Sequence, residues 1–169
     1  RREVKDLLSY MKVVDNAQDD LAVQRIINVP KRGIGATSIG KASDYAYHMG
    51  WNLFEALEKA DEIPTLGRAA GKIAPFVALI HRFRSVCADQ GVSALLQEII
   101  DETGYVEELQ LEGTDEAKAR IENIDELITK VVSYEQEAEE PSLSGFLEEV
   151  ALVADIDSLA DDGSYVVLM

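Results

Sequence analysis

The chain has 169 residues, with 16 Lys and Arg against 32 Asp and Glu, and so a formal net charge of -16. This length suffices for one domain with a hydrophobic core, and 47% hydrophobic residues are typical of a globular protein rather than a disordered one. No run approaches the roughly 18 apolar residues of a membrane-spanning helix. Cys87, the single cysteine, excludes an internal disulfide and a cysteine-based zinc site. Residues 1–6 contain no apolar core of a secretion signal, so we expect a cytoplasmic protein.

Strong acidity argues against a protein that coats nucleic acid, but the charge is unevenly distributed. Residues 1–84 hold 13 Lys and Arg and 10 Asp and Glu, a net charge of +3. Residues 85–169 hold 3 Lys and Arg and 22 Asp and Glu, a net charge of -19. The first half can therefore still meet a polyanion through a local basic patch.

Hydrophobic spacing predicts helices along most of the chain. They cover residues 3–14, 20–29, 37–49, 51–60, 67–88, 92–103, 114–137 and 142 onwards. Asp19 or Asp20 is the expected cap of the second helix, while Gly50 and Gly104 are expected to end the third and the sixth. Only residues 165–169 indicate a β-strand. The predicted fold is all-α with one short terminal strand.

The most informative segment, residues 29–35, joins the second and third predicted helices and reads Val-Pro-Lys-Arg-Gly-Ile-Gly. Two glycines permit positive φ and close backbone approach, and the isoleucine between them can pack between the helices. The following helix would point its free N–H groups and its positive dipole end at a bound anion. Such a helix-hairpin-helix-like element grips phosphates and does not read base sequence. The candidate DNA-binding residues are Lys31, Arg32, Gly33, Ile34, Gly35, Thr37, Ser38 and Lys41.

Three alternatives compete around this segment. Gly-Ile-Gly can be only a tight interhelical turn. Thr37 or Ser38 can cap the helix instead of donating to a phosphate oxygen. Arg68, Lys72, Arg82 and Arg84 could extend the basic patch, although only Arg68 and Lys72 lie one helical turn apart. Residues 35–41 also match the first seven positions of a nucleotide-binding P-loop, but Ala42 lacks the hydroxyl that magnesium requires. We expect no catalytic residue, cofactor site or metal site in this chain.

Several stretches resemble the UvrD/PcrA/Rep helicases of superfamily 1. In that family an R-x-E-I-K-D helix precedes an R-x-x-N-x-P-x-R-G-I-G segment, at a spacing similar to that of residues 2–10 and 25–35 here. Gly104-Tyr105, residues 119–127 and residues 143–152 are similar to further stretches of the family. The resemblance covers essentially the whole chain.

The resemblance implies a fragment of a longer helicase. Residues 1–14 would be a helix of motor domain 2A, residues 15–163 the accessory 2B domain, and residues 164–169 a strand that returns to 2A. Because the Walker A and Walker B motifs are absent, this chain would not hydrolyse ATP, and ATP and Mg would bind the full-length parent only.

The implied role is to bind duplex DNA through the hairpin and to swivel about linkers near residues 15–20 and 158–164. The parent would be an ATP-dependent 3′–5′ DNA helicase of bacterial DNA repair or replication, and the partners would be duplex DNA and the parent's own motor domains. Two other functions stay open. One is an acidic helical protein-interaction module without DNA binding, and the other is a small nucleotide-binding protein built on residues 35–41.

Overall fold

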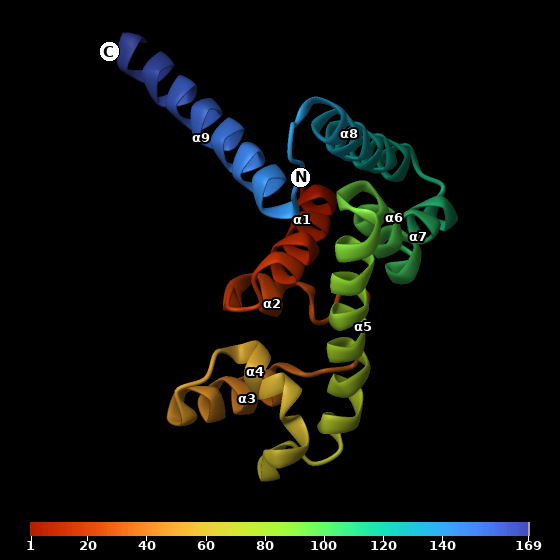
Figure 1. Cartoon of the computed structure of the whole chain (residues 1–169), viewed down its shortest axis with the longest axis vertical. Helices are drawn as coiled ribbons and strands as arrows, with labels where there is room; N and C mark the ends of the chain where they lie inside the picture. The colour runs from red at the N-terminus through yellow and green to blue at the C-terminus, as the bar shows by residue number, and fades with distance from the viewer. Residues whose placement is uncertain (169) are drawn as a thin grey trace.

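The computed structural model describes the backbone of residues 1–168 and the side chains of residues 1–159. Regular structure in this range is entirely helical, which confirms the all-α prediction (Figure 1). The α-helices are α1 (Arg2–Asp15), α2 (Asp20–Ile26), α3 (Ala36–Met49), α4 (Leu53–Glu58), α5 (Ala69–Gln90), α6 (Val92–Thr103), α7 (Tyr105–Glu112), α8 (Asp115–Glu137) and α9 (Leu143–Leu168). Two 3-10 turns, η1 (Ala60–Glu62) and η2 (Pro64–Leu66), lie between α4 and α5.

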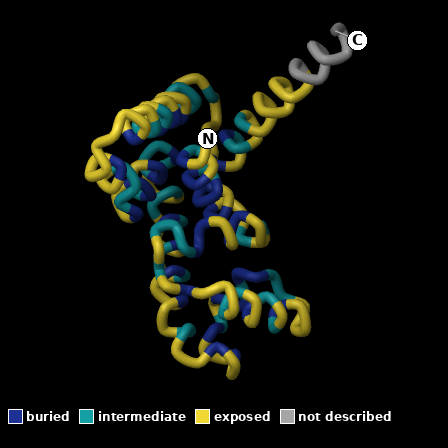
Figure 2. Tube along the Cα trace, turned by 180° about the vertical axis from the view of Figure 1, so that it is seen from behind, coloured by how far each residue is buried: buried dark blue, intermediate teal, exposed yellow. Residues whose placement is uncertain are grey.

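Helix α1 forms the centre of the structure. It contacts α2, α5, α6, α8 and α9, and its side chains Leu7, Tyr10 and Met11 are completely buried. Figure 2 shows this concentration of buried residues just below the N-terminus. Burial of apolar surface is the main favourable term in folding, so α1 organises the helices around it. The division of the chain at residue 15 stays a prediction.

Helices α3 and α4 and the two 3-10 turns form a second group beside the first half of α5 (Figure 1). Asn52 begins α4 through a capping box with Glu55, and Gly50 ends α3 in the left-handed conformation. The Leu53 N–H donates to the Asp20 carboxylate at 3.0 Å, which ties α4 to the start of α2. The hairpin of residues 27–35 connects the two groups.

Most predicted helix ends are confirmed. The Asp19 side chain caps α2, and Gly104 follows α6 in the left-handed conformation. Thr114, predicted as the first residue of a helix, is instead the cap of α8. The sequence prediction missed α7, because Leu109 is its only buried side chain and so short an apolar pattern gives little periodicity. Along residues 1–168, no helix combines the length and the apolar character needed to cross a membrane.

The predicted strand at residues 165–169 is wrong for residues 165–168, where α9 continues as a helix to Leu168. Met169 lies outside the described residues. A strand needs a neighbour to satisfy its backbone N–H and C=O groups, and residues 1–168 contain no strand to pair with. A helix satisfies these groups within itself, so the strand propensity of the valines is overridden.

Candidate nucleic-acid interface

The hairpin between α2 and α3 is built around a buried isoleucine. Ile34 is 2% exposed, as expected for a residue that packs into the core, while the glycines on either side are exposed. Gly33 has φ +75°, a value that side chains with a Cβ rarely adopt, so the predicted need for glycine holds here. Gly35 has φ -71° and needs no such freedom. It serves instead as the residue that precedes the first turn of α3.

Asn28 closes the hairpin, a role that the sequence prediction missed. Its side-chain oxygen accepts the N–H groups of Ile34, at 3.1 Å, and Arg32, at 3.3 Å. Its amide nitrogen donates to the Ile34 carbonyl. An asparagine beside a glycine-rich turn commonly bonds to nearby backbone in this way, and that is the signal that could have identified it.

Arg32 points into the structure rather than toward solvent. Its guanidinium donates to the carbonyls of Ile26, at 2.8 Å, and Ile27, at 3.0 Å, and to the Tyr10 hydroxyl at 2.6 Å. The guanidinium carbon also lies 5.0 Å from the centre of the Phe76 ring. A cation is favourable at these last carbonyls of α2, where the negative end of the helix dipole lies. Arg32 therefore holds the hairpin against α1 and α2, whereas the sequence had indicated a contact with DNA.

The N-terminus of α3 is open. Gly35 offers no side-chain cap, and the N–H groups of residues 36–38 have no hydrogen-bond partner in the described part of the chain. Thr37 is exposed and Ser38 half-buried in the first turn, so neither caps the helix as the sequence had suggested. No acidic residue lies in this turn. The positive end of a 14-residue helix thus faces solvent beside the hairpin.

Three lysines belong to the hairpin, to α3 and to α5. Lys31 is exposed and makes no hydrogen bond or ion pair with any residue whose side chain the structure describes. The Lys41 ammonium donates to the Thr65 carbonyl at 3.1 Å. The Lys72 ammonium, from α5, lies 3.4 Å from the Gly33 carbonyl. The structure therefore brings Lys72 to the hairpin.

Residues 35–41 do not form a nucleotide-binding loop. They are the first turns of α3, whereas a P-loop follows a strand and leaves its backbone free to wrap around phosphates. Within residues 1–159 no cluster of three or more His, Cys, Asp or Glu side chains could hold a metal ion.

Behind the hairpin lies a pocket of about 310 Å³ between α1, α6, α7 and residues 28–31. Its charged lining is balanced, with three cations against three carboxylates. A pocket with both signs of charge does not favour a polyanion. Its charged residues are Arg2, Lys31, Arg120, Asp6, Glu108 and Glu112.

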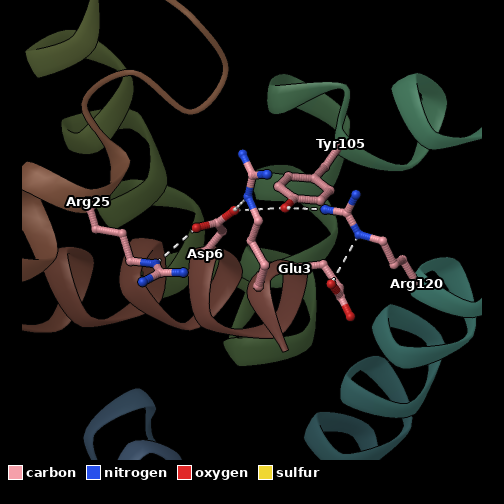
Figure 3. A network of polar contacts seen from close by, with 6 residues as sticks. Glu3, Asp6, Arg25, Tyr105 and Arg120 are labelled. Atoms are coloured by element: carbon pink, nitrogen blue, oxygen red, sulfur yellow. Dashed lines mark hydrogen bonds and ion pairs between the residues drawn. The ribbon is translucent and has the colours of Figure 1, made fainter. Parts of the chain in front are cut away.

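On the floor of this pocket, Asp6 of α1 connects two other helices (Figure 3). Its carboxylate accepts from the Arg25 guanidinium of α2 at 2.9 Å and from the Tyr105 hydroxyl of α7 at 2.7 Å. Asp6 is 3% exposed. Burial raises the pKa of Tyr105, and its hydrogen bond to Asp6 raises it further, so the phenol keeps its proton.

Glu3, one turn earlier on α1, makes the matching connection to α8. Its carboxylate accepts from the Arg120 guanidinium at 3.2 Å and from the Asn123 amide at 2.7 Å. Burial alone would raise the pKa of Glu3, but the hydrogen bonds from Asn123 and Arg120 outweigh it, and the pKa is lowered from 4.5. Several residues that carry the family resemblance thus meet in one polar network around α1.

The lowered pKa of Glu3 predicts a pH-dependent part of the stability. A carboxylate with a lowered folded-state pKa stabilises the fold above its unfolded-state value, here near pH 4.5, and loses this contribution as the pH falls through the folded-state pKa. Glu3→Gln should therefore be less stable than the native chain at pH 7, with a difference that shrinks below pH 4.5. Denaturant unfolding of both proteins across this range measures the difference, and a constant difference would contradict the prediction.

Comparison with known proteins agrees with this architecture. The family model of the UvrD-like helicase C-terminal domain matches residues 1–169. The chain is 40% identical over 159 residues to the ATP-dependent DNA helicase PcrA of Bacillus subtilis (strain 168), an alignment that covers 94% of this chain and 22% of that relative. It is 40% identical over 171 residues to PcrA of Staphylococcus aureus (strain Mu50), covering 100% of this chain and 23% of that relative. The chain thus spans less than a quarter of the length of these relatives.

Proposed function

Because the chain belongs to the UvrD-like helicase C-terminal domain family, we propose that it is the duplex-DNA-binding and regulatory 2B domain of an ATP-dependent 3′–5′ DNA helicase used in repair or replication. The similarity to PcrA helicases over the whole chain supports this assignment. ATP hydrolysis, with its Mg, would belong to the rest of the parent protein. The parent's motor domains would then be the partners of this domain.

The observation that carries the proposal is the open N-terminus of α3 beside a hairpin that is fixed from within. Asn28 and Arg32 hold the loop, so little conformational entropy is lost when a ligand binds to it. The unpartnered N–H groups of residues 36–38 and the Lys31 ammonium suit a phosphate in both charge and hydrogen bonding. No base-reading side chain is required, so the expected ligand is the duplex backbone, whatever its sequence.

The regulatory half of the proposal is a rotation of this domain relative to the motor. Rotation would change how the hairpin meets the duplex ahead of the motor, and would thereby change unwinding. We place the domain at residues 15–163, with flanking pieces of 2A. Helix α1, which packs against five other helices, would move with the domain if these contacts persist in the parent.

The test measures binding of the 169-residue chain to a labelled duplex by fluorescence anisotropy, over a series of salt concentrations. Contact with two to four phosphates predicts a plot of log K against log salt with a slope of about -2 to -4. Lys31→Ala should make this slope less steep by about 1 and weaken binding to all sequences alike. Lys118→Ala removes the same charge from the exposed face of α8 and should change neither quantity.

A second variant tests the helix end separately. Thr37→Glu places a carboxylate in the first turn of α3, where the dipole should stabilise it by about 0.3–1 kcal/mol. The same carboxylate should repel a phosphate, so this variant should fold at least as well and bind DNA less tightly, while Thr37→Gln should bind normally. If Lys31→Ala and Thr37→Glu both bound DNA as the native chain does, the hairpin would not be the DNA-binding element. Absence of duplex binding even at low salt would favour the acidic protein-interaction module.

A further inference from the structure

Two long stretches of this acidic chain contain no acidic residue. Residues 21–43 contain four Lys and Arg residues and no Asp or Glu. Residues 63–88 also contain four Lys and Arg residues and no Asp or Glu. The first stretch contains the hairpin and most of α3, and the second contains η2 and most of α5. In a chain with 32 acidic residues, such gaps mark the only long segments where a bound phosphate would meet no nearby carboxylate along the backbone.

Of the eight cations in these stretches, the four arginines other than Arg68 all bond to groups of the protein. Arg25 binds Asp6, and Arg32 binds the carbonyls at the end of α2. Arg82 pairs with two glutamates of α6, at 2.5 and 2.7 Å. Arg84 donates to the Val14 carbonyl. These four arginines thus already have partners within the protein.

The other four cations are exposed, and no carboxylate lies within ion-pair distance of any of them among residues 1–159. They are Lys31, Lys41, Arg68 and Lys72. The fold brings their two stretches together at two points. Lys41 reaches the carbonyl of Thr65, three residues before Arg68, and Lys72 reaches the carbonyl of Gly33.

We propose that Arg68, which immediately precedes α5, and Lys72 in the first turn of α5 form a second contact to the backbone of the same duplex that the hairpin binds. This inference rests on the proposed function and extends it from one hairpin to a basic surface of two elements, with Lys41 between them. The two residues lie four positions apart, about 6 Å along the helix axis, so both can face one strand. Exposed cations with no carboxylate partner suit backbone phosphates, which they bind through charge rather than through base-specific hydrogen bonds.

The experiment compares Arg68→Ala/Lys72→Ala with the native chain in the same salt series. Each phosphate contact contributes about 0.9 to the magnitude of the slope, so the double variant should reduce it by about 2. Both side chains are exposed, so the variant should unfold at the denaturant concentration of the native chain. Lys118→Ala/Lys130→Ala, which removes two exposed charges from α8, is the matched control and should keep the native slope.

A charge-preserving variant separates binding from support of the hairpin. Arg68→Lys/Lys72→Arg keeps both charges but alters the bond between Lys72 and Gly33, and it should retain the native slope. If Lys31→Ala weakens binding while Arg68→Ala/Lys72→Ala does not, this inference is overturned and the hairpin proposal stands. If none of these variants changes binding, the proposed function fails as well. If the control Lys118→Ala/Lys130→Ala reduces the slope as much as Arg68→Ala/Lys72→Ala does, only the overall charge matters and the second contact is refuted.

Discussion

Arg32→Ala should destabilise the domain by about 2–4 kcal/mol, because it leaves several buried acceptors without a donor. The guanidinium serves the carbonyls of Ile26 and Ile27 and the hydroxyl of Tyr10, which is completely buried. The contact with the Phe76 ring would be lost as well. Urea unfolding followed by circular dichroism measures the change as a lower midpoint with an unchanged slope.

Two neighbouring variants separate the structural role of Arg32 from a DNA contact. Lys31→Ala removes the same charge one residue earlier and, because Lys31 is exposed, should change the stability by no more than about 0.5 kcal/mol. Arg32→Lys should recover only part of the stability, since one ammonium cannot reproduce the planar fork that reaches three acceptors. If Arg32→Ala kept the native stability but abolished duplex binding, the guanidinium would be a phosphate ligand and the inward geometry would be refuted.

The hairpin shows what could be predicted locally and what could not. The roles of Gly33 and Ile34 follow from their residue types, because glycine tolerates a positive φ and isoleucine is apolar enough to be buried. The sequence therefore indicates both. The direction of Arg32 depends on where Tyr10 and Phe76 lie, and these residues are distant in the chain. From the sequence alone, an arginine in a basic loop is predicted to bind the ligand. In the structure, Arg32 instead points inward, toward Tyr10 and Phe76.

The ends of the helices show the same difference between features that depend on neighbouring residues and features that depend on distant ones. The Asp19 cap acts within three residues of its own position, and its prediction is confirmed. A strand depends on a partner elsewhere, which is why residues 165–168 were predicted wrongly. The burial of Glu3 and Asp6 is equally non-local. Their spacing places both on one side of α1, but only the packing of α7 and α8 shows that this side is interior.

The polar network around α1 is the other place where one substitution should have a large effect. Asp6→Ala should cost about 1–3 kcal/mol, because it leaves the half-buried Tyr105 hydroxyl without its acceptor, whereas the Arg25 guanidinium, whose side chain is 38% exposed, can turn to water. Arg25 would lose its carboxylate, and the Tyr105 hydroxyl would lose its acceptor. Asp44→Ala, on the exposed surface of α3, removes the same group where the described residues give it no partner, and should have little effect.

A double-mutant cycle shows whether this cost comes from the contact between α1 and α2. Arg25→Ala alone leaves the buried Asp6 carboxylate without its closest cation, so it too should destabilise the fold. Once Asp6 is absent, Arg25→Ala should cost much less, and the coupling energy should lie between about 0.5 and 3 kcal/mol. Tyr105→Phe, which removes one hydrogen bond to Asp6, should cost about 1 kcal/mol. Additive effects of Asp6→Ala and Arg25→Ala would mean that the ion pair contributes nothing, and that α1 is held to α2 by its apolar side chains alone.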